Sequence, residues 1–421
     1  MEINMRSEGK WVSSSGILKG RINIKAKEGN MDGLRELVEK MNTTQKDAFR
    51  REYGNLLGLI EVEVQISAIT TLAQYYDPPL RCFTFQDFQL VPTVEEFEQI
   101  LGVSLERKTP YNYLRQYIPV LQLARIIKIH PMQLEREFTT KGKVRGLPQG
   151  YLEVYLHRLA EEERWETFMD VLALLLYGVM LFPNVKNFID NAAINAFVGY
   201  KDRFENPVTA VLAEVYGTLQ HCYEKKGGQM LCCLPVLYVW FVSRVIKNAL
   251  NATCPVDELL QCKPNMKGTN EWAQLCAGLN VEQIRWNVPW QQRSQIIYYC
   301  GRYPNVPLMG IRCCINYNPV LAQRQFGYPL RGAPTPASLA TLQIYYEKGT
   351  FAEVLSQIKD AWGNVVRAER DPRPWTVDER IPYNHWIAER VKTVRLPFEL
   401  ISLNLDCEEQ HQKAEVRKCN C

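Results

Sequence analysis

The chain has 421 residues, of which 46% are hydrophobic and 23% charged, and its 50 Lys and Arg against 46 Asp and Glu give a formal net charge of +4. These values exclude a wholly disordered chain, a collagen-like fibre and a highly basic packaging protein. The length fits two or three folding units, or one large unit with a sizeable apolar core.

Periodicity predicts a mainly helical chain, beginning with short amphipathic helices at 31–41 and 45–53 and a longer one at 56–76. The aromatic run 82–90 partly alternates and is typical of short strands. Thr93 and Glu96 form a capping box that predicts a helix start, and Gly102 predicts its end. The next predicted helices are 114–129, 131–138, 151–163, 165–182, 185–198, 207–223 and 230–250, with a turn at 225–228 before the last.

The sequence pattern changes after residue 284, where short runs of β-branched and aromatic residues are separated by Pro, Gly and Asn. We expect a small sheet or irregular platform at about 284–318. Helices are predicted again at 338–347, 351–367 and 383–394. The fold expected is therefore a large helical domain with a small β or irregular insert, at about 82–90 and 284–318.

The thirteen cysteines are odd in number and include the adjacent pairs Cys232-Cys233 and Cys313-Cys314. Residues 1–30 contain no apolar core of a secretory signal. We interpret the cysteines as reduced thiols and expect a nuclear or cytoplasmic protein.

Two apolar runs could be mistaken for membrane spans. Residues 168–182 contain Asp170, and residues 231–242 are only twelve positions long. A spanning helix needs about 20 mostly apolar residues, so both runs are predicted to be buried core helices and no membrane partner is expected.

Signatures of known chemistry are missing from the sequence. It contains no phosphate-binding glycine loop, no H-E-x-x-H helix and no G-x-S-x-G elbow. His157 and Glu161 can share a helix face, where a surface contact is the ordinary interpretation, whereas His221 and Cys222 are adjacent and point in different directions.

A metal site is not predicted either. Cys407, His411, Cys419 and Cys421 lie close together near the end of the chain, but their spacing does not match the paired ligands of structural zinc. We therefore predict no catalytic residue, no metal and no cofactor.

One charge distribution is unusual. Between Glu282 and Glu347 the chain has no Asp, Glu or Lys, where about seven acids would be expected at the average frequency. This acid-free segment, residues 283–346, contains six arginines interleaved with ten aromatic residues. The tentative anion or partner surface comprises Arg285, Arg293, Arg302, Arg312, Arg324, Arg331, Trp286, Trp290, Tyr303 and Tyr317.

Three interpretations of the acid-free segment stay open. Its arginines can snorkel or bind carbonyl groups in a buried structural platform. Arg, Tyr and Trp are also enriched in protein interfaces. Arginine with aromatic rings suits phosphates and unstacked bases as well, so nucleic acid is a further partner class.

Several blocks in order resemble a known family. The block YYDPPLRCFTFQDFQLVPTVEEFEQILGV resembles the signature of the plant mobile domain, also called the aminotransferase-like plant mobile domain. WETFMDVLALLLYGVMLFPNVKNFID, EKKGGQMLCCLPVLYVWF, YPNVPLMGIRCCINYNPVLAQRQFGYP and HWIAERVKTVRLPF are similar to a legume-rich branch described as a domain of unknown function. The resemblance runs from about residue 29 to residue 398.

The resemblance implies a domain derived from a plant retrotransposon or transposon and brings no catalytic residue to this chain. We expect a poorly ordered segment at 1–28, the helical domain at 29–398 and a charged tail at 399–421. The leading hypothesis is a non-enzymatic nuclear interaction domain that binds other proteins, with nucleic acid as a second class of partner. The alternatives are a capsid-like or scaffolding protein of a mobile element and, third, an uncharacterised enzyme.

Overall fold

The structure is a computed structural model that describes residues 5–6, 10–11, 22–106, 108–112, 119–246, 252–290, 295–328, 333–346, 351–369 and 377–394. The expected tail 399–421, with its Cys and His residues, lies outside the described residues. The described chain is mainly helical and carries several small, separate sheets, which confirms the predicted class.

The first two helices begin within two residues of the predicted positions, and side chains cap the second of them. Helix α1 spans Asp32–Glu39 and α2 spans Thr43–Tyr53, and Asn42 and Gln45 cap α2 reciprocally. The single helix predicted at 56–76 is wrong: the chain forms α3 (Leu56–Ile60), α4 (Ile66–Leu72) and the short η1 (Ala73–Tyr75). The break lies beside Gln65, whose side chain accepts from Trp272 Nε1 at 2.9 Å and Lys267 N at 3.0 Å.

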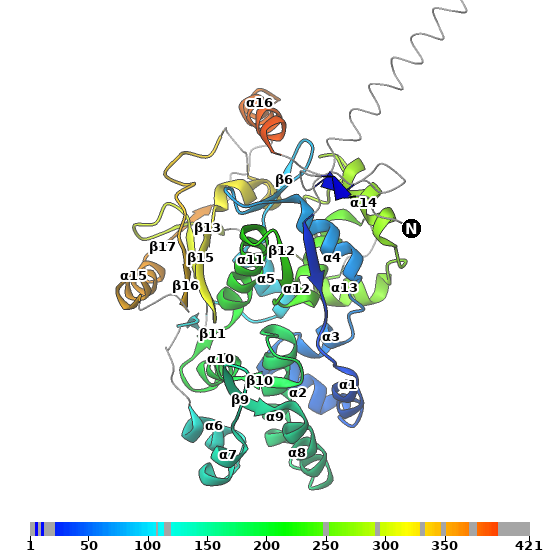
Figure 1. The fold of residues 1–421 in the computed structure, drawn as a ribbon, viewed down its shortest axis with the longest axis vertical. Coiled ribbons are helices and arrows are strands. Elements are labelled where there is room, and N and C mark those ends of the chain that lie inside the picture. Colours follow the sequence, from blue (N-terminus) through cyan, green and yellow to red (C-terminus); the bar gives the residue numbers. More distant parts are fainter. Residues whose placement is uncertain are drawn as a thin grey trace, which may run out of the picture.

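Helices α6 to α10 surround a three-stranded antiparallel sheet in the lower part of Figure 1. Their bounds are α6 (Val120–Ile126), α7 (Pro131–Glu137), α8 (Gln149–Glu161), α9 (Trp165–Leu176), the π-helical η2 (Tyr177–Leu181) and α10 (Asn191–Asp202). The sheet has the order β10 (Phe188–Asp190), β9 (Val144–Pro148), β8 (Thr139–Lys141). The helix predicted at 185–198 therefore starts too early, because β10 pairs with β9 and the Asp190 carboxylate then caps α10 by accepting from Ala193 N at 2.8 Å.

The centre of the core is formed by three helices. The capping box of Thr93 and Glu96 opens α5 (Val94–Leu101), and Gly102 closes it with a left-handed φ of 68°, as predicted. Helices α11 (Val208–Glu224) and α12 (Leu234–Val245) are buried on nearly every side, which agrees with the apolar character of their sequences. In the part of the chain that the structure describes, no helix is long and apolar enough to cross a bilayer.

Two helices between residues 252 and 283 were not predicted. They are α13 (Pro255–Cys262) and α14 (Thr269–Gly278), and they contact α12 and α4 respectively. Both are short, and their apolar faces are recognisable only against the helices that they cover.

Strands flank α11 on one side of the molecule (Figure 1). One antiparallel sheet has the order β14 (Val306–Met309), β15 (Cys313–Tyr317), β16 (Gln343–Tyr345), and β13 (Gln295–Cys300) pairs with β17 (Val365–Glu369). The predicted insert at 284–318 thus contributes strands to two separate sheets, β13 to one and β14 and β15 to the other. The helix predicted at 338–347 is wrong, because its residues 343–345 pair with β15, and the one at 351–367 ends early, as α15 (Ala352–Trp362).

The remaining elements are short strands and two further helical segments. The run 82–90 supplies β5 (Cys82–Thr84) and β6 (Gln89–Leu90), which pair with each other, and β5 also pairs with β4 (Tyr76–Asp77). Within the expected N-terminal segment, β3 (Asn23–Ala26) pairs with β12 (Gly227–Met230), where a turn was predicted. The others are β1 (Met5–Arg6), β2 (Lys10–Trp11), β7 (Thr109–Pro110), β11 (Glu205–Asn206), η3 (Pro319–Phe326) and α16 (Val377–Thr393).

Candidate interaction surface

The acid-free segment is held by carboxylates from other parts of the chain. Four almost fully buried glutamates reach into it: Glu95 and Glu96 on α5, Glu214 on α11 and Glu258 on α13. On α5, Glu95 accepts from Ile297 N at 2.6 Å, and Glu96 accepts from Gln325 Nε2 at 3.0 Å. The missing acids are therefore supplied by the helical core, which neutralises and orients the segment.

Arg312 is hydrogen-bonded to several parts of the fold. Glu214 on α11 accepts from the Arg312 backbone amide at 3.0 Å and from its Nε at 2.5 Å, and also from Ile311 N. The Arg312 guanidinium further donates to the carbonyl groups of Pro183 and Leu231. Its donors are occupied inside the fold and do not face a partner.

Arg285 and Trp290 share one buried carboxylate. Glu258 on α13 accepts from Arg285 Nη2 at 2.9 Å and from Trp290 Nε1 at 3.1 Å. Arg285 also donates to the carbonyl of Ser243. These hydrogen bonds connect the start of the acid-free segment to α12 and α13.

The other aromatic members are mainly packing residues. Tyr317 is buried and stacks on Tyr216, with ring centroids 5.8 Å apart. Trp286 is half-buried, and the Arg324 guanidinium lies 4.4 Å from its ring centroid. Tyr303 is half-buried against the core.

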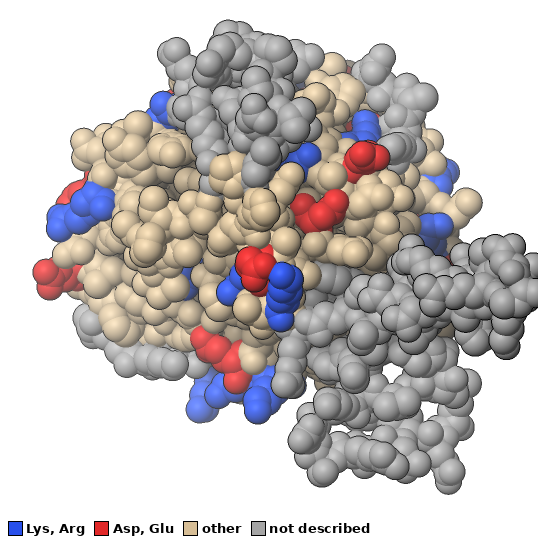
Figure 2. All heavy atoms as spheres, turned by 90° about the horizontal axis from the view of Figure 1, so that it is seen from above, with Lys and Arg blue, Asp and Glu red and all other residues tan. Residues whose placement is uncertain are grey.

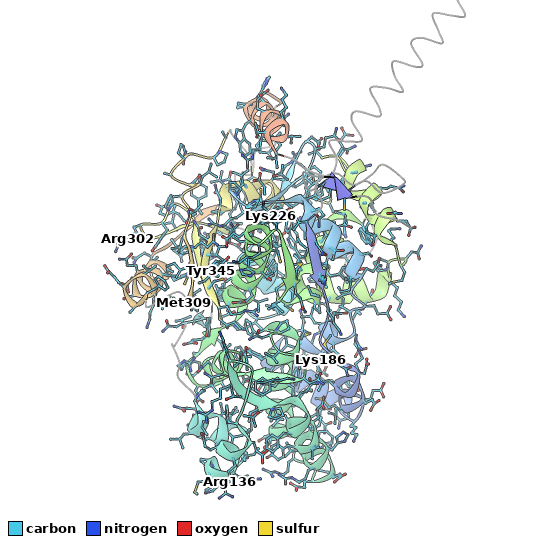
Figure 3. All side chains as sticks on the ribbon, viewed as in Figure 1. Arg136, Lys186, Lys226, Arg302, Met309 and Tyr345 are labelled. Carbon is cyan, nitrogen blue, oxygen red and sulfur yellow. The ribbon has the colours of Figure 1, made fainter. Side chains whose placement is uncertain are left out.

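The structure does not bring the predicted residues onto one surface. Arg293 and Arg331 lie outside the described residues. Of the remaining four arginines, only Arg302 is classed as exposed, and it projects from the side of the molecule that carries β17 and α15 (Figure 3).

Arg302 lies just after β13 (Gln295–Cys300), a strand with exposed tyrosines that sequence reasoning did not select. Tyr298 and Tyr299 on β13 are 37% and 36% exposed, and Val366, which faces Tyr299 across the pairing with β17, is 38% exposed. The two tyrosine rings contact edge to face, with centroids 6.1 Å apart. We call Tyr298, Tyr299, Arg302 and Val366 the tyrosine–arginine surface.

Adjacent Tyr298 and Tyr299 are both exposed because the strand pairing is irregular between them. The register of β13 with β17 shifts between Ile297 and Tyr299, so the usual alternation of inward and outward side chains is interrupted. The pair Tyr-Tyr is visible in the sequence, but the bulge that exposes both rings depends on β17, which lies about 70 residues further along the chain.

The charge on the upper end of the molecule is sparse. Figure 2 shows small groups of basic and acidic side chains scattered over a largely uncharged surface. A surface that tracks a nucleic acid backbone is more continuously basic. On this face, the distribution is closer to that of a protein interface.

Several buried cysteines are poor nucleophiles. Burial raises the pKa of the Cys233, Cys300 and Cys314 thiols to about 12, and it raises the pKa of Cys82 and Cys313 well above the ordinary value. The thiolate is the reactive form, so these groups stay protonated near neutral pH. Within the described ranges, no three His, Cys, Asp or Glu side chains gather closely enough to hold a metal ion.

A polar cluster between α2, α9 and α10 was also missed by sequence reasoning. Asp170 accepts from the Tyr53 hydroxyl and lies 3.1 Å from Lys201 Nζ. Nearby, Lys108 Nζ lies 3.1 Å from the Tyr200 ring centroid, and burial lowers the pKa of Lys108 to about 8. The residues of this polar cluster come from distant segments of the chain, so no local sequence motif predicts the cluster.

Comparison with known families gives one match. The model of a family described as Domain of unknown function (DUF7745) matches residues 34–392. No match was found among curated proteins or among solved structures.

Proposed function

This chain belongs to the family described as Domain of unknown function (DUF7745), and we propose that it is a non-enzymatic interaction domain that binds another protein. The observation that carries the proposal is the tyrosine–arginine surface. Tyrosine and arginine are enriched at the energetic centres of protein interfaces, because they combine large contact area with hydrogen bonding at low conformational cost.

The rigid support of this surface favours the same proposal. Beneath it, Ile296, Ile297 and Cys300 of β13 are buried, and Glu95 binds the backbone amide of Ile297. A preorganised surface loses little conformational entropy when a partner binds.

The origin that we propose is a mobile element. The sequence blocks that resemble the plant mobile domain support a transposon-derived domain acting in the nucleus. A capsid-like or scaffolding role is the alternative, and it would bring copies of this chain together.

The test is cross-linking of the purified chain in nuclear extract, followed by reconstitution with each recovered protein. We expect Tyr298→Ser combined with Tyr299→Ser to abolish binding of the reconstituted partner. Leu121→Ser is the matched control, because Leu121 is 70% exposed on α6 and lies outside the tyrosine–arginine surface. Equal binding by both variants would overturn the proposal.

Two further measurements separate the alternatives. Salt-dependent binding of a single-stranded oligonucleotide that Arg302→Met removes would assign the surface to nucleic acid. Oligomers that grow with concentration in light scattering would favour the scaffolding role, whereas a monomer at high concentration would count against it.

A further inference from the structure

Arg81 is almost fully buried, but no carboxylate of the described chain pairs with it. Only 4% of Arg81 is exposed, whereas Arg244, Arg285 and Arg312 each bind a buried glutamate. Within the described chain, its guanidinium has one hydrogen-bond acceptor, Asn316 Oδ1, which accepts from Nη1. Its Nε is buried with no acceptor.

The groups around Arg81 do not supply the missing negative charge. Tyr76, Tyr216, Tyr345 and Cys313 surround it, and burial raises the pKa of each, so that all four are neutral at physiological pH. Burial also lowers the pKa of Arg81, but a guanidinium remains protonated in proteins.

The nearest acid in sequence serves a different arginine. The Asp77 carboxylate accepts from Nε and Nη2 of Arg390 on α16 and from the Thr84 hydroxyl. The positive charge of Arg81 is thus buried without compensation by an ion pair. Such an arrangement is costly, and a buried donor without an acceptor requires an explanation.

The orientation of the guanidinium leaves one edge free. Asn316 is fixed in turn, since its Nδ2 donates to Ala340 O at 2.7 Å and its Oδ1 accepts from Leu342 N at 2.9 Å. With Nη1 committed to Asn316, the edge formed by Nε and Nη2 donates to no described residue. That edge is the one that binds a carboxylate or phosphate through two parallel hydrogen bonds.

The backbone holds Arg81 in an uncommon conformation. Its φ is 51°, in the left-handed region that non-glycine residues rarely adopt. Its amide donates to Asp77 O at 2.8 Å, which closes the turn between β4 and β5. The backbone conformation of Arg81 therefore has a free-energy cost, in addition to the cost of burying its charge.

Tyr345, one of the residues around Arg81, is half-exposed and is labelled in Figure 3. Its hydroxyl accepts from Gln343 Nε2 at 2.8 Å and lies 3.4 Å from a carboxylate oxygen of Glu224. Gln343 Nε2 also donates to Glu224 at 2.6 Å, so the Tyr345 hydroxyl and the Gln343 amide are already committed to the Glu224 carboxylate. The hydrogen bonds to an oxyanion therefore come from the Nε and Nη2 edge of Arg81.

We propose that Arg81 anchors a binding site for a small oxyanion, a carboxylate or phosphate group held on its Nε and Nη2 edge. The bound oxyanion supplies the negative charge that no described carboxylate provides to Arg81. This site is independent of the tyrosine–arginine surface, so either proposal can fail without the other.

The experiment measures thermal unfolding and calorimetric binding of the full chain in sodium phosphate, sodium acetate or sodium chloride at equal ionic strength and pH 7. We expect phosphate or acetate to raise the midpoint temperature saturably above its value in chloride, and the more effective anion identifies the ligand class. Arg81→Met should weaken the apparent affinity at least tenfold. It should also melt higher than the natural chain in chloride, because it removes a buried, unpaired charge.

Arg136→Met is the control, because Arg136 is exposed on α7 and lies at the lower end of the molecule, far from Tyr345 (Figure 3). It should keep the full response to the anion. The Arg81 Nε–H resonance of the ¹⁵N-labelled natural chain should shift on titration with the effective anion, which tests the site even where the methionine variant does not fold. No saturable effect beyond chloride, an unchanged response in Arg81→Met, or an unmoved Nε–H resonance would overturn the proposal.

Discussion

The Glu214 carboxylate on α11 binds Arg312 twice, at its backbone amide and at its Nε, and so ties the acid-free segment to the core. The contact joins residues that are 98 positions apart in the chain. It explains why one region can lack acidic residues altogether, since its counter-charges come from helices that the fold places against it.

Glu214→Gln should destabilise the protein by about 3 kcal/mol, because it leaves the Arg312 guanidinium without a carboxylate. Chemical unfolding in urea measures the change. Glu135→Gln breaks the exposed pair with Arg145 and should cost less than about 1 kcal/mol. Equal losses in the two variants would contradict a structural role for the buried pair.

Glu28 should make stability depend on pH. Burial raises the pKa of its carboxyl group to about 7, against a smaller opposing effect of Arg35, and its Oε1 is buried without a hydrogen-bond partner. The folded state therefore binds a proton that the unfolded state releases, and stability falls as pH rises from about 4.5 to about 7. The loss expected is about 1–2 kcal/mol, reduced for the solvent that reaches the group.

Urea unfolding at pH 5 and pH 8 measures this effect in the natural chain and in Glu28→Gln. The glutamine variant should lose less stability between the two pH values. Glu36→Gln, at an exposed position of α1, is the control and should behave like the natural chain.

Gly146→Ala should lower stability by at least about 2 kcal/mol. A Cβ atom at this position of β9 would lie 2.1 Å from the backbone oxygen of Ile189 on β10, which cannot move away without disturbing the strand pairing. Gly150→Ala on α8 is the matched control, because a Cβ there meets nothing within 4 Å. Thermal unfolding compares the two, and similar midpoints would contradict the close approach of β9 and β10.

The buried cysteines should resist alkylation in the folded protein. Iodoacetamide needs both access and a thiolate, and Cys276 is buried with its pKa raised by burial. Cys262 is only half-buried and should react faster than Cys276. Peptide mass spectrometry after brief labelling, repeated in urea, checks the order, and native labelling of Cys276 at the rate seen in urea would refute it.

Local sequence signals determined the helical class and several helix ends. The Thr93 and Glu96 capping box and the left-handed Gly102 appear as predicted, because capping depends on residues within one turn of each other. The apolar runs that became α9 and α12 were identified as core helices for a similarly local reason, their length and composition.

Tertiary structure decided the strands and the surface. Residues 343–345 have a pattern that fits a helix, but they pair with β15 and form a strand. The local sequence does not reveal this pairing, because the partner strand lies in a distant segment. For the same reason, the composition of the sequence revealed the acid-free segment, but it did not identify the buried glutamates that pair with its arginines. Glu214 and Glu258 occupy Arg312 and Arg285, whereas Arg81, outside the segment, was left unpaired, because burial and ion pairing depend on which distant side chains the fold brings together.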